Sequence, residues 1–160
     1  MDKFSKWIKW ENRNNLNNIQ FPGIYIIAIS NKNLEYAEFK WIQEIKYIGM
    51  TNSVAGLKGR LKQFDNTIFG KTGHGGADRF RYEYQNYDEL IKNLYVSVRY
   101  FKCDVKSNKP EDLRIMGEVA KFEYDCFALY TEQFGSLPKF NDKKNSPKYS
   151  LTYGRKTKNG

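Results

Sequence analysis

The chain has 160 residues, a formal net charge of +9, and 16% aromatic residues. This length suits one domain with its own hydrophobic core and argues against a second domain. The positive charge favours a polyanionic partner, most commonly nucleic acid, although lysines also serve simply to solubilise a surface. No apolar run has the length of a transmembrane helix, and the first ten residues lack the continuous apolar core of a signal peptide, so no membrane partner is expected.

The two cysteines, Cys103 and Cys126, are far apart in the sequence. Because there is no CxxC pair, a structural zinc site is not expected. One potential disulfide does not make a secreted scaffold. We therefore predict two reduced, buried thiols in a cytoplasmic protein.

Residues 1–21 are polar and rich in asparagine, with Trp7, Ile8 and Trp10 as their main apolar cluster. We expect an arm or short helix whose tryptophans dock on the core, because large aromatic side chains are costly to leave in water. The alternative is that these tryptophans stack on nucleic-acid bases.

Two segments rich in β-branched and aromatic residues, 22–29 and about 39–50, predict strands. Strands this close in sequence usually pair antiparallel, through the turn-rich residues 30–38. Each strand places a tyrosine near a glycine, in Gly23-Ile24-Tyr25 and in Tyr47-Ile48-Gly49. Taken alone, these tyrosines are best explained as core aromatics of a small sheet.

A helix is predicted after the second strand, because its apolar residues recur at steps of three and four. These residues are Val54, Leu57, Leu61, Phe64 and Ile68. The outer face of the helix would carry Lys58, Arg60 and Lys62. Residues 70–78 contain four glycines, which predicts a loop, and this loop holds His74, the single histidine of the chain.

The second half of the chain predicts a short helix over 88–94, a third strand over 95–101 and a long helix over 110–134. Pro110 suits the first turn of that helix, and Gly135 suits its end. The fold class is therefore α/β (α+β): a small three-stranded antiparallel sheet flanked by helices. We divide the chain into an N-terminal arm (1–21), a core domain (22–141) and a loosely held, basic C-terminal tail (142–160).

Glu123 lies at the centre of the apolar stripe of the long helix, at about 100° per residue. The apolar residues on that stripe are Met116, Val119, Ala120, Cys126, Phe127, Tyr130 and Phe134. Glu118 and Glu132 fall on the opposite face and are expected to be solvated. A carboxylate within a buried stripe needs a partner. The sequence leaves two explanations equally open: a buried salt bridge, for example to Arg60, or a metal ligand or catalytic group in a cleft.

These residues together resemble the GIY-YIG endonuclease superfamily. Gly23-Ile24-Tyr25 and Tyr47-Ile48-Gly49 match its two signature strands, and Arg60 and Glu123 match its helix-borne arginine and glutamate. Asn141, soon after Pro138, matches its later asparagine. The resemblance covers about residues 22–141, with a longer stretch between the two tyrosines and a longer gap before Asn141 than is typical.

The resemblance implies a metal-dependent endonuclease that hydrolyses phosphodiester bonds in DNA, with Mg²⁺ or another divalent cation such as Mn²⁺. It implies Tyr25 as general base or water-positioning group, Tyr47 as the group that orients water or phosphate, and Arg60 as the phosphate ligand. Glu123 would be the sole protein ligand of the metal, and His74 could share in proton transfer.

The resemblance also gives supporting roles to Gly23, Gly49 and Asn141, beside the catalytic groups. From charge alone, Lys71, Arg79 and Arg81 are candidate contacts to the nucleic-acid backbone, and the basic tail could add affinity by counterion release. The main alternative is a non-catalytic nucleic-acid-binding module on the same fold. A purely structural or protein-interaction domain is the third possibility, and the sequence leaves monomer and homodimer open.

Overall fold

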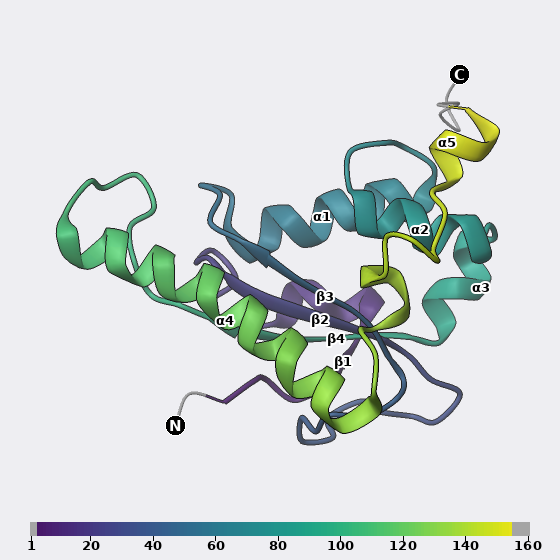
Figure 1. The fold of residues 1–160 in the computed structure, drawn as a ribbon, viewed down its shortest axis with the longest axis horizontal. Coiled ribbons are helices and arrows are strands. Elements are labelled where there is room, and N and C mark those ends of the chain that lie inside the picture. The colour runs from purple at the N-terminus through teal and green to yellow at the C-terminus, as the bar shows by residue number, and fades with distance from the viewer. Residues whose placement is uncertain (1–2, 155–160) are drawn as a thin grey trace.

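A four-stranded antiparallel sheet forms the centre of the molecule in the computed structural model, which describes residues 3–154 (Figure 1). The strands, in the spatial order β1-β4-β2-β3, are β1 (Ile8–Lys9), β4 (Leu94–Tyr100), β2 (Gly23–Ile29) and β3 (Ile45–Thr51). The predicted count of three strands is therefore wrong by one. The additional strand, β1, has two residues paired with β4, which is too short to show an alternating pattern in sequence.

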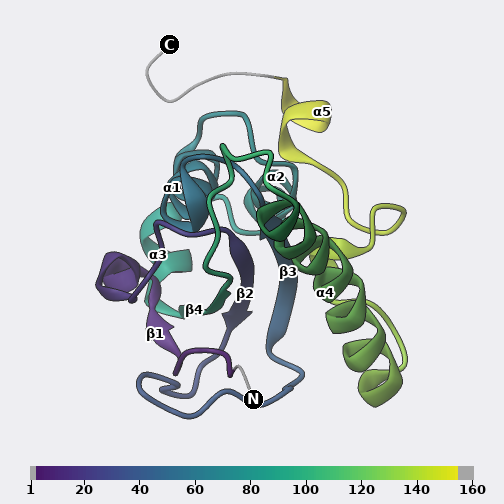
Figure 2. The same ribbon diagram turned by 90° about the vertical axis from the view of Figure 1, so that its left-hand side faces the viewer.

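Helices cover both faces of this sheet (Figures 1 and 2). One face packs against α1 (Gly56–Phe69), α2 (Gly75–Glu83) and α3 (Tyr87–Lys92), and the other packs against α4 (Pro110–Phe134). The remaining elements are the 3₁₀ helices η1 (Trp10–Asn15) and η2 (Lys139–Asn141), and α5 (Tyr149–Tyr153). The molecule therefore has three layers, with β3 as an edge strand beside α4.

The register of β2 and β3 sets the two tyrosines on the same face. Tyr25 lies opposite Gly49, and Tyr47 lies opposite Ile27. Because side chains alternate along a strand, both phenols point toward α1 and α2, while Ile48 points toward α4. The connection between the strands is long, as predicted, but β3 begins only at Ile45.

Helix α2 begins inside the segment predicted as a loop. The loop is confined to residues 70–74, because the side chain of His74 caps the helix and accepts a hydrogen bond from the Ala77 N–H at 3.1 Å. The cap and the packing of α2 against α1 offset the helix-weakening effect of Gly75 and Gly76. Helix α1 also begins later than predicted, so Val54 lies outside it and is exposed.

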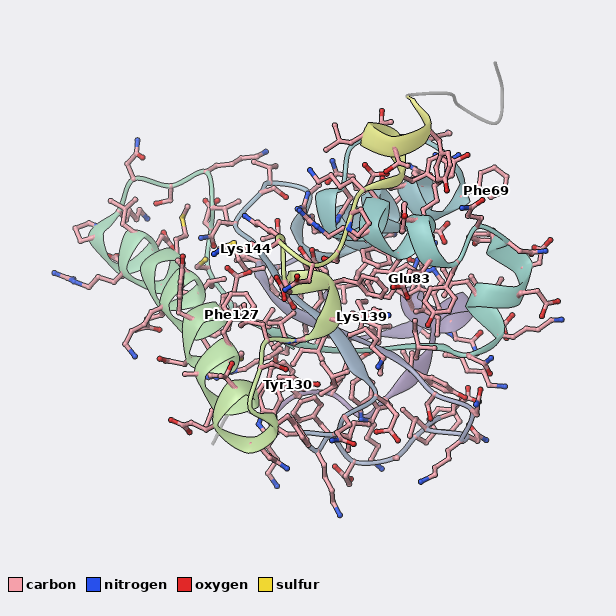
Figure 3. The ribbon with its side chains drawn as sticks, turned by 45° about the vertical axis from the view of Figure 1, so that its right-hand side comes forward. Phe69, Glu83, Phe127, Tyr130, Lys139 and Lys144 are labelled. Carbon is pink, nitrogen blue, oxygen red and sulfur yellow. The ribbon has the colours of Figure 1, made fainter. Side chains whose placement is uncertain are left out.

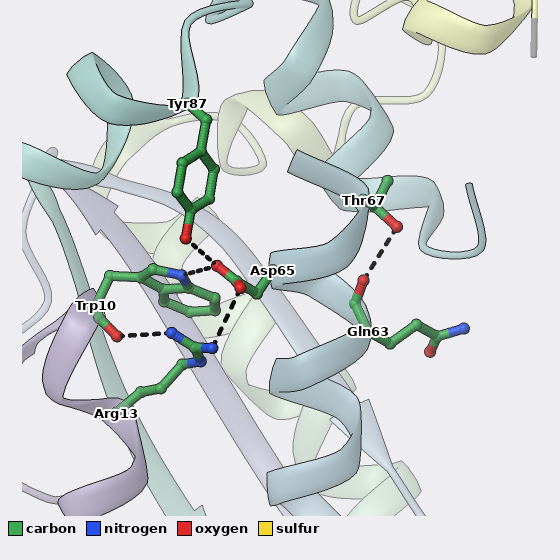
Figure 4. Close-up of polar contacts among 6 residues, drawn as sticks. All are labelled: Trp10, Arg13, Gln63, Asp65, Thr67 and Tyr87. Carbon is green, nitrogen blue, oxygen red and sulfur yellow. Dashed lines mark hydrogen bonds and ion pairs between the residues drawn. The ribbon is translucent and has the colours of Figure 1, made fainter. Parts of the chain in front are cut away.

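The N-terminal arm is fixed to the core by its tryptophans, as predicted, since Trp7 and Trp10 are 1% and 0% exposed. Asp65 of α1 binds the arm from the side (Figure 4). Its carboxylate accepts hydrogen bonds from Trp10 Nε1 and Tyr87 Oη, both at 2.8 Å, and forms an ion pair with Arg13 at 3.2 Å. Burial and the neighbouring Asp65 raise the pKa of Tyr87 to about 12. Neither tryptophan is therefore available for stacking on bases.

Helix α4 has the predicted bounds, and Gly135 ends it with a φ of +83°. Val119, Cys126 and Tyr130 are buried beneath it, whereas Ala120, at the margin of the predicted stripe, is exposed. The two glutamates assigned to its outer face are exposed as predicted. Even this helix, the longest between residues 3 and 154, lacks the apolar character needed to cross a membrane, and no other helix in that range qualifies.

Two further predictions need correction. Both cysteines are free, but only Cys126 is buried, and Cys103 is half-exposed. The C-terminal tail is not loosely held in its described part, because residues 142–154 pack on α2 through hydrogen bonds and ring contacts. The tail lysines and arginine at 155–160 lie outside the described residues.

Candidate active site

Two tyrosines and one histidine meet on the α1–α2 face of the sheet. The ring centroids of Tyr25 and Tyr47 are 6.0 Å apart, and His74 lies 6.0 Å from the first and 5.7 Å from the second. Tyr25 Oη and His74 Nε2 share a hydrogen bond of 2.6 Å. The histidine that the sequence placed in a glycine-rich loop is thus part of the same cluster as both tyrosines.

The tautomer of His74 follows from its two hydrogen bonds. Its Nδ1 accepts from the Ala77 N–H, so the proton of the neutral ring lies on Nε2. Nε2 therefore donates to Tyr25 Oη, which leaves the phenol proton of Tyr25 free to point elsewhere. Burial, with Arg60 and Arg79 nearby, lowers the pKa of His74 from 6.5 to about 3, so the ring is neutral around pH 7.

Two glycines make room for the phenol rings. A Cβ on Gly49 would overlap the Tyr25 ring, which lies across the bare backbone of β3. A Cβ on Gly76 of α2 would come within 2.5 Å of the Tyr47 ring. Gly23 has a different function, since a Cβ there would collide with the β4 backbone at Arg99. The need for Gly76 was missed from the sequence, where it was one glycine among four in a presumed loop.

Arg60 of α1 lies beside this cluster rather than on a solvated face. Burial is the main cause that raises the phenol pKa values and lowers that of His74, and the charge of Arg60 also acts on all three groups. The guanidinium donates a hydrogen bond to Gln63 Oε1, while its Nε is buried and has no protein partner among the described residues. A buried donor without a partner is suited to bind an incoming anion.

Glu123 lies on α4, which packs beside the edge strand β3, and is close enough to interact electrostatically with Tyr47 and Arg60. Burial raises the pKa of its carboxyl, whereas Arg60 and Lys143 lower it, and its charge in turn acts on Tyr47. No cation among residues 3–154 comes within 4.0 Å of this carboxylate, so the salt bridge to Arg60 considered from the sequence is not formed. The half-buried carboxylate is thus near the cluster and unpaired.

Asn141 fixes the backbone between Tyr47 and Gly49. Its side-chain amide donates to Ile48 O and accepts from Ile48 N–H, both at 2.9 Å. Because β3 is an edge strand, these backbone groups would otherwise have no partner in the sheet. Asn141 therefore acts as a local substitute for a neighbouring strand and holds the segment that carries Tyr47.

The three residues predicted to contact the nucleic-acid backbone lie in different environments. Lys71 is exposed on the loop before α2. Arg81 is buried, donates to Gly70 O at 3.1 Å and stacks under Tyr149, an arrangement that favours a structural role. Arg79 is also buried, with its Nε bonded to Ser146 O at 3.2 Å and its Nη1 near Gly75.

The donor set is compatible with a magnesium ion held by a single side chain. Within residues 3–154, no three His, Cys, Asp or Glu side chains gather into a metal cage. Mg²⁺ commonly keeps several waters and binds only one or two protein carboxylates. Glu123, half-buried and unpaired, is the carboxylate of the cluster that could serve as such a ligand.

The lowered pKa of His74 predicts that the folded protein becomes less stable at acid pH. Because its folded-state pKa is about 3, the unfolded chain binds the extra proton below pH 6.5, and the stabilising contribution of the neutral ring is lost as the pH falls from 6.5 toward 3. We expect the free energy of unfolding to fall by up to about 1.4 kcal/mol per pH unit in this window. Urea titrations between about pH 7 and pH 5 measure this slope.

His74→Asn is the matched variant, because asparagine can still cap α2 and the chain then has no histidine. Carboxylates titrate in both proteins, so the difference between the two slopes isolates His74. Equal slopes would contradict the assignment of a buried neutral ring.

No protein-family model matches this chain, and neither a curated protein nor a solved structure matches it. The candidate site is therefore supported by its own geometry alone. It combines two phenols, a neutral imidazole that caps α2, a guanidinium, and a carboxylate without an ion-pair partner among the described residues. These groups come from β2, β3, α1, α4 and the loop before α2.

Proposed function

We propose that this protein is a metal-dependent endonuclease that hydrolyses phosphodiester bonds in nucleic acid, with DNA as the expected substrate. The observation that carries the proposal is the convergence of Tyr25, Tyr47, His74, Arg60 and Glu123 on one place. Phosphodiester hydrolysis needs an activated water, stabilisation of charge on the phosphate and assistance to the leaving oxygen. The cluster supplies chemical groups for the first two requirements.

In this proposal the two phenols have different tasks. Tyr25 is 0% exposed, and burial raises its pKa well above the usual value, so it is poorly placed to receive a proton from water. Tyr47 is half-exposed, and burial also raises its pKa, but a hydrogen bond from Tyr25 and the charge of Arg60 act in the opposite direction. Tyr47 is therefore the phenol that orients the attacking water, while Tyr25 links it to His74.

Arg60 binds the non-bridging oxygens of the scissile phosphate, because its guanidinium offers several donors in a planar fork and its buried Nε has no protein partner among the described residues. Glu123 would hold the divalent cation, Mg²⁺ or Mn²⁺. When bound, this ion would stabilise charge on the phosphate and lower the pKa of water. Asn141 keeps Tyr47 in place through the Ile48 backbone.

One observation supports a second candidate, a nucleic-acid-binding module without cleavage. Within the described part of the chain, no group of three metal-ligating side chains forms around Glu123, so the metal would depend on few protein ligands. The two candidates share a basic surface and differ in whether the phosphate backbone is cut.

Cleavage assays distinguish these candidates. Supercoiled plasmid, linear duplex DNA and RNA are incubated with the protein and Mg²⁺ or Mn²⁺, with EDTA as the negative control. Arg60→Ala is expected to slow cleavage by roughly 10² to 10³, the effect of removing one donor to a developing oxyanion. Lys58→Ala, which removes an exposed charge from the same helix, is expected to cleave as the wild type does.

Salt-sensitive binding without metal-dependent cleavage would establish the binding module instead. A wild-type protein that neither binds nor cuts any of these nucleic acids would leave the third possibility, a structural or protein-interaction domain.

A further inference from the structure

Residues 142–153, here named the C-terminal strap, run from η2 along α2 and end in α5 (Figures 1 and 2). The strap begins near the site, where the charge of Lys143 acts on Glu123. Just before the strap, Lys139 of η2 forms an ion pair with Glu83 of α2 at 2.7 Å (Figure 3). This ion pair joins η2 to the end of α2 that lies farthest from His74.

Three charged side chains of α2 are buried because they hold this strap. Asp78, Arg79 and Arg81 are 6%, 9% and 7% exposed. The Asp78 carboxylate accepts from Ser150 N–H at 3.1 Å and from the Ser150 hydroxyl. Arg79 Nε donates to the backbone of the strap, and the Arg81 guanidinium lies 3.8 Å from the centroid of the Tyr149 ring. These contacts fix the strap at several points, so its side chains have defined places.

This arrangement places one side chain of the strap, that of Lys148, beside the candidate site. Lys148 Nζ lies 3.3 Å from the position that a Cβ on Gly75 would occupy, and Arg79 Nη1 lies 3.7 Å from the same position. Gly75 follows His74 directly, so the two cations are beside the histidine that binds Tyr25.

The two cations have no neutralising partner in the described chain. No carboxylate between residues 3 and 154 lies within 4.0 Å of Lys148 Nζ or of the Arg79 guanidinium. Like charges on the same side of Gly75 repel one another, and partial burial strengthens the repulsion because it lowers the local dielectric constant. An anion placed between them would remove the repulsion and gain charge-assisted hydrogen bonds.

We propose that Lys148 and Arg79 form a phosphate subsite that binds the nucleic-acid backbone at a phosphate next to the scissile one. This inference rests on the proposed function, because it takes Arg60 as the ligand of the scissile phosphate. The subsite positions the strand along α2 and the strap, and takes no part in bond cleavage. From charge alone, the sequence predicted Arg79 as a contact to the nucleic-acid backbone and included Lys148 only in the general charge of the basic tail.

Lys148→Met tests the subsite, with Lys144→Met as its matched control. Both lysines belong to the strap and both changes remove one charge, but the side chain of Lys144 is exposed (Figure 3). Binding of a labelled DNA duplex is measured in EDTA over a series of NaCl concentrations, so that no cleavage occurs.

Lys148→Met is expected to weaken binding about tenfold at low salt and to reduce the slope of log Kd against log salt by about 1, as expected for one lost phosphate contact. Lys144→Met is expected to remain within roughly twofold of the wild type, and Lys148→Arg is expected to restore most of the affinity. Circular dichroism and Tm check that the strap is intact in each variant. Wild-type affinity in Lys148→Met, or an equal loss in Lys144→Met, would overturn the subsite while leaving the endonuclease proposal standing.

A wild-type protein without affinity for DNA or RNA would overturn the proposed function instead. In that case inorganic phosphate alone tests the subsite. A rise in the Tm of the wild type with phosphate, absent in Lys148→Met, would support an anion site, and no rise in the wild type would overturn it.

Discussion

Glu123→Gln is expected to abolish metal-dependent cleavage, with a rate at least roughly a thousandfold below that of the wild type. Glutamine keeps the size of the side chain but removes the charge that would hold the divalent cation, and such an ion contributes several kcal/mol to transition-state stabilisation. The folded protein should tolerate the change well, because the carboxylate is half-buried without an ion-pair partner among the described residues. Plasmid cleavage in Mg²⁺ and DNA binding in EDTA are measured on the same preparations.

Glu118→Gln is the control for this experiment, since it removes a carboxylate from the exposed face of the same helix. It should cleave at the wild-type rate. DNA binding should be retained or slightly tightened in Glu123→Gln, because a negative charge has been removed from a cationic site. Equal cleavage by the wild type and Glu123→Gln would show that any observed activity does not come from this site.

Tyr47→Phe is expected to lower the rate of cleavage by roughly 10² or more, because the attacking water loses the hydroxyl that orients it. The loss should appear in kcat, because the phenol acts on the attacking water and not on binding of the substrate. Phenylalanine preserves the ring that packs against Phe64 and Phe80, so the change tests the hydroxyl alone. Single-turnover cleavage assays give the rate of the chemical step.

Tyr25→Phe provides the comparison that separates the two phenols. The change removes the hydrogen bond between Tyr25 Oη and His74 Nε2. It should slow cleavage less than Tyr47→Phe does, since Tyr25 acts on the water only through Tyr47. It should also lower the free energy of unfolding by about 1–3 kcal/mol, because a buried histidine N–H is left unpaired. A larger loss of activity in Tyr25→Phe would exchange the two roles and make Tyr25 the phenol that orients the water.

The sequence by itself determined the features that depend on local pattern. Enrichment in β-branched and aromatic residues predicted strands over 22–29 and about 39–50, although the second begins only at Ile45. Pro110 and Gly135 predicted the bounds of α4, and the helical period predicted the face on which Glu123 lies. That face could be predicted because a repeat of 3.6 residues fixes side-chain direction within a helix, whatever the helix packs against. The resemblance of the two tyrosine segments to a nuclease signature remains a prediction that assays must test.

The tertiary structure alone decided what lies between elements far apart in the chain. His74 caps α2 and shares a hydrogen bond with Tyr25 only because α2 packs against α1. The glycines at the start of α2 disfavour a helix there when only the local sequence is considered. The short strand β1 exists only because β4 offers it an edge. Lys148 lies beside Gly75, the residue after His74, only because Asp78 and Arg79 hold the strap along α2. Such contacts depend on pairing between distant segments, which local residue patterns do not encode.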